Sequence, residues 1–217
     1  HPTRGVVAAG GFLPVVQEIG MMGSLTYWVI ERACRDLTAW WAKGLDMPRM
    51  AVNISPVVLE DGDFGDRLTG ILDRHGIPHS KFEIELTENV FIADQQTVSS
   101  RLASLARSGI RIAIDDFGTQ YSSLSYLRNL PVDTIKIDQC FVREIEQGRE
   151  DSTIIRAIVA IASGLGLHVV AEGVETTLQA SFLKTVGARE MQGFLFGRPM
   201  GFNDFSSLLS SEGAVAH

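Results

Sequence analysis

Residues 110–118 read IRIAIDDFG, an apolar run that ends directly in two carboxylates. The run is short and rich in isoleucine, which is typical of a buried strand. The same plan recurs from Met50 onward, because each short apolar run ends in polar residues and an amphipathic helix pattern follows. The other expected strands lie at residues 50–52, 82–86, 132–137, 167–170 and 193–196.

The segments between these runs carry apolar residues at steps of three and four, which predicts helices that each bury one face. Gly76, Gly109 and Gly187 fall where such helices should stop, because glycine readily accepts a left-handed conformation. Two further helices are expected before the first strand, at residues 12–19 and about 25–41. Strands alternating with helices predict an α/β fold with a parallel sheet.

Six strand candidates are fewer than the eight of a (β/α)8 barrel. The first 43 residues predict only helix, so the pattern leaves two possibilities open. The chain is either a smaller open sheet or a barrel whose first part is absent. We expect one domain over residues 1–217, with a frayed tail at residues 210–217.

The composition excludes several classes of protein. Hydrophobic residues make up 45% of the 217 residues and charged residues 21%, which is typical of a folded globular chain. The net charge of −7 argues against a surface for polymeric nucleic acid or an anionic membrane. Two cysteines are too few for a disulfide framework, and we find neither a signal peptide nor a membrane-spanning run. We therefore expect a cytoplasmic protein without membrane contact.

Polar side chains stand at the carboxyl end of every expected strand, and the gaps between them are those of βα units. In chain order they are Asn53, Glu85 with Glu88, Asp115 with Asp116, Lys136 with Asp138, Glu172 with Glu175, and Gln192. A single carboxylate after a strand is usually a helix cap or a solvated charge. Six consecutive units with this feature predict one shared rim, which is where barrels build active sites.

Carboxylates gathered around one lysine would repel each other unless cations offset their charge. Carboxylate and amide oxygens suit Mg²⁺ or Mn²⁺ rather than Zn²⁺. The adjacent pair Asp115 and Asp116 is suited to two ions, which can clamp the attacking and leaving oxygens of a phosphodiester. The histidines show no ligand spacing, and we expect His168 to pack within its strand. No serine-nucleophile elbow or P-loop motif is present.

Several segments together closely resemble the EAL domain, a family of bacterial cyclic-di-GMP phosphodiesterases. They read VNISP at 52–56, EIELTEN at 83–89, IDDFGT at 114–119, YSSL at 121–124, IKID at 135–138, AEGVET at 171–176 and QGF at 192–194. FLPVVQEIG at 12–20 is similar to the family's first helix. The resemblance implies a modified TIM barrel, (β/α)8 in type, with one strand antiparallel to the rest.

The resemblance also implies metal-dependent hydrolysis of cyclic-di-GMP to linear pGpG, in bacterial second-messenger signalling. The implied metal ligands are Asn53, Glu85, Asp115, Asp116 and Glu172. The implied catalytic residues are Glu172, Lys136 and Gln192. Substrate contacts are expected from Asp138, Gly193 and Phe194, and loop or supporting roles from Glu88, Glu175 and Gln120. Family members often dimerise, so a homodimer and fused sensory or GGDEF domains are the further partners to consider.

Two departures from the family pattern bear on activity. The Glu-Ala-Leu tripeptide does not occur among the 217 residues, and in the family it belongs to the second strand, which would lie upstream of His1. We therefore expect a barrel that lacks its first two strands and one metal-ligating glutamate. Gln120 stands where the family has glycine, which alters the loop after Asp116. The alternatives are a cyclic-di-GMP receptor without turnover, or a metal-dependent barrel that acts on another phosphate or an enolisable acid.

Overall fold

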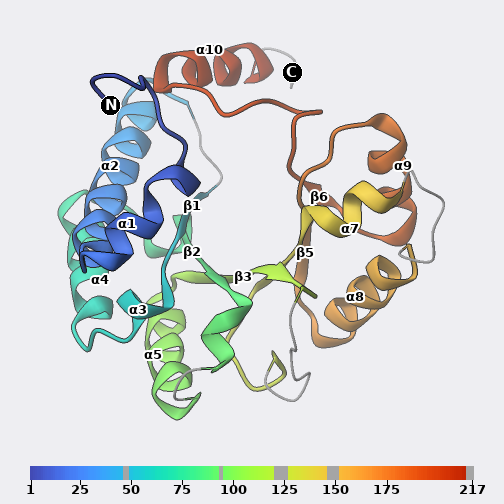
Figure 1. Cartoon of the computed structure of the whole chain (residues 1–217), viewed down its shortest axis with the longest axis horizontal. Helices are drawn as coiled ribbons and strands as arrows, with labels where there is room; N and C mark the ends of the chain where they lie inside the picture. The colour runs from blue at the N-terminus through green and yellow to red at the C-terminus, as the bar shows by residue number, and fades with distance from the viewer. Residues whose placement is uncertain (46–48, 93–94, 120–126, 146–151, 214–217) are drawn as a thin grey trace.

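The computed structural model describes residues 1–45, 49–92, 95–119, 127–145 and 152–213 (Figure 1). The strands are β1 Met50–Asn53, β2 Phe82–Thr87, β3 Arg111–Phe117, β4 Thr134–Ile137, β5 His168–Ala171 and β6 Glu190–Met191. The α-helices are α1 Leu13–Glu18, α2 Met22–Ala42, α3 Pro56–Leu59, α4 Phe64–Arg74, α5 Gln95–Ser108, α7 Gln139–Glu144, α8 Ser152–Leu165, α9 Thr177–Val186 and α10 Phe202–Gly213. Short 3₁₀ helices are η1 Ala9–Gly11, η2 His79–Lys81 and η3 Glu88–Ile92.

The six strands form one parallel sheet in the order β1-β2-β3-β4-β5-β6. The sheet curls around a common centre with helices along its outer side, and α10 lies on the open side between the β1 and β6 edges (Figure 1). Every strand follows its neighbour in the chain, which is the order of strands in a (β/α)8 barrel. The prediction of a partial barrel with six parallel strands is confirmed.

The central strands are the most buried part of the sheet. All four residues of β4 and the first five residues of β2 are buried. A strand in the middle of a curled sheet is covered by helices on its outer face and by side chains of the other strands on its inner face. Both faces of these strands are therefore buried, although their sequences, FEIELT and TIKI, alternate apolar with polar residues.

The outer helices bury the faces that their periodicity predicts. In α4 the buried residues are Phe64, Leu68, Ile71 and Leu72. The start of α9 is fixed by a capping box between Thr176 and Gln179. Its end is Gly187, which has a positive φ of 98°. Gly76 and Gly109 also have positive φ values, 66° and 95°, so the expected stops are confirmed.

An ion-pair network connects distant strands at the amino-terminal end of the sheet. The Nε of Arg49, the residue before β1, lies 3.4 Å from Oε2 of Glu83 in β2. The Nη2 of the same arginine lies 3.7 Å from Oε2 of Glu190 in β6. Burial raises the pKa of Glu83, and the charge of Arg49 opposes that shift. The arginine therefore joins the two edges of the sheet across the interior of the curl.

Two expectations about the carboxyl-terminal third were wrong. Residues 193–196 do not form a strand, because the Phe196 N–H donates to the Gly193 carbonyl in a turn. The sixth strand lies earlier, where Glu190 and Met191 pair with Val170 and Ala171. An apolar run alone does not distinguish a strand from a turn that carries exposed aromatic residues. His168 is exposed instead of packed, because it is the first residue of β5 at its amino end.

The carboxyl-terminal helix is anchored to α2 through an indole ring. Trp40 stacks on Phe202 with ring centroids 5.0 Å apart and meets the edge of Phe205 at 5.2 Å. Residues 210–213 continue α10. None of the helices in the described ranges combines the length and the apolarity that a bilayer crossing needs.

The anchor of α10 gives the first prediction. The buried Trp40 Nε1–H donates to Ser206 Oγ at 2.9 Å, so Ser206→Ala leaves a buried donor without its acceptor. We expect a loss of about 1–3 kcal/mol in the free energy of unfolding. Ser207→Ala is the matched control, because Ser207 is exposed and its hydroxyl donates to the Asn203 carbonyl within its own helix. Equal thermal unfolding temperatures for the two variants would contradict the anchor.

Candidate active site

The candidate active site lies at the carboxyl end of the sheet, where the strand pairing places its side chains in one row. Asn53 at the end of β1 pairs in register with Glu85 of β2. Thr87 of β2 pairs with Asp115 of β3, and Lys136 lies one residue before the end of β4. Glu172 directly follows β5, and its N–H donates to the Ile137 carbonyl at 3.0 Å. Parallel strands bring all these positions to the same rim.

Lys136 is the centre of the described site. Its Nζ lies 2.8 Å from Glu85 Oε1, 3.3 Å from Asp115 Oδ1 and 2.6 Å from Glu172 Oε1. The lysine is buried, as are Glu85 and Asp115. Burial alone would lower the pKa of Lys136, but the charges and hydrogen bonds of Glu85 and Glu172 raise it above its ordinary value. The ammonium is therefore charged and held by three carboxylates from different parts of the sheet.

Asn53 orients Glu85. Its Nδ2 donates to Glu85 Oε2 at 3.0 Å, while Oε1 of the same carboxylate contacts Lys136. The amide nitrogen is thereby used within the protein, so the amide oxygen is the Asn53 atom that can serve as a metal ligand.

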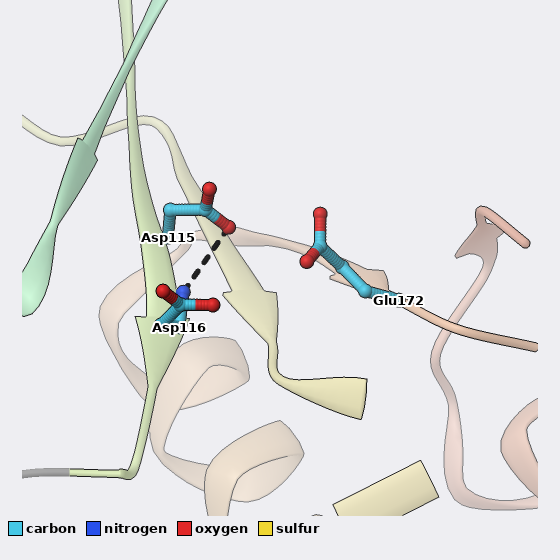
Figure 2. A group of neighbouring side chains, drawn as sticks. All are labelled: Asp115, Asp116 and Glu172. Atoms are coloured by element: carbon cyan, nitrogen blue, oxygen red, sulfur yellow. Dashed lines mark hydrogen bonds between the residues drawn. The ribbon is translucent and has the colours of Figure 1, made fainter. Parts of the chain in front are cut away.

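Three carboxylates of the rim form one cluster. One oxygen from each of Asp115, Asp116 and Glu172 lies within 4.8 Å of the other two. Figure 2 shows the two aspartates on one strand, with Glu172 facing them from the segment after β5. The Asp116 N–H also donates to Asp115 Oδ1 at 3.1 Å. Carboxylate oxygens at this spacing fit a hard divalent cation such as Mg²⁺ or Mn²⁺.

The position of Asp116 depends on an irregularity in β3. Successive side chains of a regular strand point to opposite faces of the sheet, so two adjacent aspartates should not share one site. Asp116 has a φ of 54°, and no other non-glycine residue in the described ranges has a positive φ. The register with β4 also shifts between Ile114 and Phe117. This left-handed residue turns both carboxylates toward Glu172, and such strain is typical of functional sites.

The close spacing of the carboxylates changes their proton affinities. Burial, a hydrogen bond with Asp138 and the charge of Asp115 raise the pKa of Asp116 to about 6. The pKa of Asp138 is lowered: burial opposes the shift, and hydrogen bonds from Cys140 drive it. Burial also raises the pKa of Glu172, although Lys136 opposes this shift. The rim thus holds more carboxylates than its single lysine can neutralise.

The other predicted site residues lie on segments that directly follow the strands. Asp138 caps α7, because its Oδ1 accepts from the Cys140 N–H at 2.7 Å. Glu88 is buried in η3, whereas Glu175 is exposed, and its N–H donates to Gln179 Oε1 at the start of α9. Gln192 is exposed just after β6, and its N–H donates to the Ala171 carbonyl.

Gly193 and Phe194 follow Gln192 in the segment after β6. The Phe194 ring is 49% exposed and has the Arg198 guanidinium over it, 4.2 Å from the ring centroid. Gln120 lies outside the described residues.

Three features of the site were not predicted from the sequence. These are the Asn53–Glu85 hydrogen bond, the Asp116–Asp138 contact and the position of Arg198 over Phe194. Only the last has a signal in the chain, because a cation four residues after an exposed aromatic residue can reach its ring. The first two depend on the curl of the sheet, which no local spacing reveals.

The raised pKa of Asp116 gives the second prediction. Below about pH 6 this carboxyl holds a proton that a cation must displace, so the affinity for Mn²⁺ should fall as the pH is lowered. If one proton is displaced, the affinity for Mn²⁺ should be about tenfold lower at one pH unit below the pKa than well above it. Calorimetric titration with Mn²⁺ at pH 5, 6 and 7 measures this loss.

Asp116→Asn is the control for that titration, and its weaker affinity should depend less on pH in the same window. Without metal, the raised pKa of Asp116 also makes the stability of the folded state depend on pH. The folded state keeps a proton that the unfolded state loses at its ordinary pKa of 3.8, so this group's contribution to stability falls as the pH rises from there to about 6. A native affinity for Mn²⁺ that is constant from pH 5 to 7 would contradict the assignment.

Comparison with known proteins agrees with this geometry. The sequence model of the EAL domain family matches residues 1–199. MucR of Pseudomonas aeruginosa, a bifunctional diguanylate cyclase/cyclic di-GMP phosphodiesterase, is 39% identical over 200 residues, which cover 92% of this chain and 29% of MucR. An uncharacterized protein of Mycobacterium tuberculosis is 42% identical over 212 residues, or 97% of this chain and 34% of that protein. The chain thus spans about a third of the length of these curated relatives.

The same resemblance holds in three dimensions. The solved structure of the MucR phosphodiesterase in complex with c-di-GMP has a TM-score of 0.90 and 38% identity, and the match covers 94% of this chain and 83% of that chain. The sequence motifs, the parallel strands and the carboxylate rim therefore lead to the same conclusion. The chain belongs to the EAL domain family.

Proposed function

We propose that this domain hydrolyses cyclic-di-GMP to linear pGpG with the help of Mg²⁺ or Mn²⁺. The observation that carries the proposal is the cluster of Asp115, Asp116 and Glu172, whose oxygens lie within 4.8 Å of one another. Together with Glu85 they give four carboxylates around one ammonium, an excess of three negative charges when all are ionised. Divalent cations would offset this charge, and phosphodiester hydrolysis is a reaction that such ions serve.

Two overlapping sets of residues would hold the ions. Asn53, Glu85 and Asp115 form the first set, and Asp115, Asp116 and Glu172 form the second. Asp115 belongs to both, because it contacts Lys136 alongside Glu85 and also has an oxygen within 4.8 Å of oxygens of Asp116 and Glu172. When bound, the ions would lower the pKa of a water molecule and neutralise charge on the phosphate.

Lys136 would stabilise the negative charge that develops on the phosphoryl oxygens. Its ammonium is already charged and already in contact with Glu85, Asp115 and Glu172. Three donors on one nitrogen allow it to exchange a carboxylate partner for a phosphate oxygen without leaving the site. The burial of this residue makes the interaction stronger than it would be in water.

Glu172 would accept the proton of the attacking water. Burial raises its pKa above the ordinary value, which makes it a better proton acceptor than an exposed glutamate. Gln192 follows β6 beside the loop that carries Glu172, and its amide would orient the water or the phosphate.

Asp138, Gly193 and Phe194 are the proposed substrate contacts. The half-exposed Phe194 ring offers an aromatic surface next to this rim, and Arg198 adds a cation over the same ring. The proposal places the domain in bacterial second-messenger signalling in the cytoplasm, with a homodimer and fused sensory or GGDEF domains as expected partners. Binding of cyclic-di-GMP without turnover is the alternative that the following experiment separates.

Glu172→Gln gives the third prediction. The substitution keeps the size of the side chain but removes the proton acceptor, so turnover of cyclic-di-GMP with Mn²⁺ should fall by about 10²-fold or more. Binding of cyclic-di-GMP should change much less. Chromatographic separation of cyclic-di-GMP and pGpG measures the first quantity, and calorimetry measures the second.

Glu60→Gln is the control, because Glu60 is an exposed glutamate just after α3. Near-native turnover in Glu172→Gln would remove this residue from the mechanism. Tight binding of cyclic-di-GMP by the native chain with no pGpG formed at any Mn²⁺ concentration would favour the receptor instead.

A further inference from the structure

Two glycines lie where the segments after β5 and β6 approach neighbouring parts of the chain too closely for any side chain. A Cβ on Gly193 would lie 2.2 Å from the carbonyl oxygen of Val174 and 2.3 Å from its nitrogen. A Cβ on Gly173 would lie 2.4 Å from Cβ of Gln139, the first residue of α7. Among the glycines that the structure describes, only these two would make a contact shorter than 3.0 Å.

Backbone hydrogen bonds hold the segments after β5 and β6 together. The Gln192 N–H donates to the Ala171 carbonyl at 2.8 Å, and the Val174 N–H donates back to the Gln192 carbonyl at 3.0 Å. The Leu195 N–H then donates to the Val174 carbonyl, also at 3.0 Å. The Val174 side chain is fully buried, so this residue cannot move outward to accept a bulkier neighbour.

The segments after β5 and β6 carry two side chains of the rim, Glu172 and Gln192. Glu172 lies between Ala171 and Gly173, and its carboxylate contacts Lys136 at 2.6 Å and faces the two aspartates (Figure 2). Gln192 immediately precedes Gly193. Any displacement of Val174 would therefore move both Glu172 and Gln192 relative to Lys136, whose strand stays fixed in the middle of the sheet.

We propose that Gly173 and Gly193 are positioning residues, which lock the segments after β5 and β6 together and thereby set the place of Glu172 in the metal cluster. This inference deepens the proposed function and rests on it. Gly193 allows the contact with Val174, and Gly173 allows the contact with the start of α7. This positioning role is separate from the substrate contact proposed for Gly193, because its tests measure Mn²⁺ affinity and amide exchange without cyclic-di-GMP.

Gly193→Ala is the first test, with Gly197→Ala as its matched control. A Cβ on Gly197 would meet only the methyl carbon of Met200, at 3.5 Å, so the control adds the same atom without a clash. We expect the Kd for Mn²⁺ to rise by about 10- to 100-fold in Gly193→Ala, as for other residues that support metal ligands. Amide exchange at Val174 and Leu195 should become faster by about tenfold, because local opening becomes easier. Gly197→Ala should change neither quantity.

Gly173→Ala is the second test, with Gly166→Ala as its control. Both glycines have similar positive φ values, 66° and 72°, but a Cβ on Gly166 would meet nothing within 4 Å. Both variants therefore carry the same backbone strain, and only Gly173→Ala adds the clash. Gln139→Gly removes the clashing atom, so the double variant should regain most of the lost Mn²⁺ affinity. A general loss of stability would not be reversed by this change.

The outcomes separate the inference from the proposed function. If the native chain binds no Mn²⁺, the proposed function fails, and the amide exchange alone then decides whether the two segments are locked. Unchanged Mn²⁺ affinity and unchanged exchange in Gly193→Ala would overturn the inference. If Gly193→Ala fails to fold, the second test decides, and a Gly173→Ala variant that Gln139→Gly does not restore would overturn it as well.

Discussion

One buried ammonium holds together the rim on which the rest of this structure depends. Lys136 contacts carboxylates from β2, from β3 and from the segment after β5, although Glu85 and Glu172 are 87 positions apart in the chain. A buried ammonium that lacks a partner lowers the stability of the folded state. Lys136 reaches all three carboxylates only when the sheet curls enough to bring these strand ends together. The same contacts leave negative charge uncompensated. The arrangement that favours the curl is thus also one that attracts cations.

Two kinds of irregular backbone position the side chains of this rim. Asp116 adopts a left-handed conformation that a regular strand would not allow, and two glycines allow the segments after β5 and β6 to interlock. Each departure is local and has a cost of its own, but each brings a carboxylate to the cluster. Regular parts of the sheet carry the core, with β2 and β4 almost wholly buried. These two strands also carry Glu85 and Lys136, so the buried core and the site share the same regular strands.

The sequence predicted most of this architecture because local patterns encode it. Apolar runs of about five residues marked β1 to β5, and glycines such as Gly187 marked helix ends. The site residues were found because each lies at or just after the carboxyl end of a strand, and parallel strands share one rim. The sixth strand was misplaced because two residues carry too little pattern, and the nearby aromatic residues belong to a turn. The left-handed Asp116 and the Asn53–Glu85 bond were missed because they arise from strand pairing, which a one-dimensional reading does not contain.

The central claim is that the carboxylates beside Lys136 form a divalent-cation site. Its most direct test is the anomalous scattering of Mn²⁺ in crystals of this chain grown with manganese. The account predicts an anomalous peak within coordination distance of Asp115, Asp116 and Glu172, and a second peak near Asn53 and Glu85. An empty rim at saturating Mn²⁺, with Lys136 still in contact with all three of its carboxylates, would contradict it.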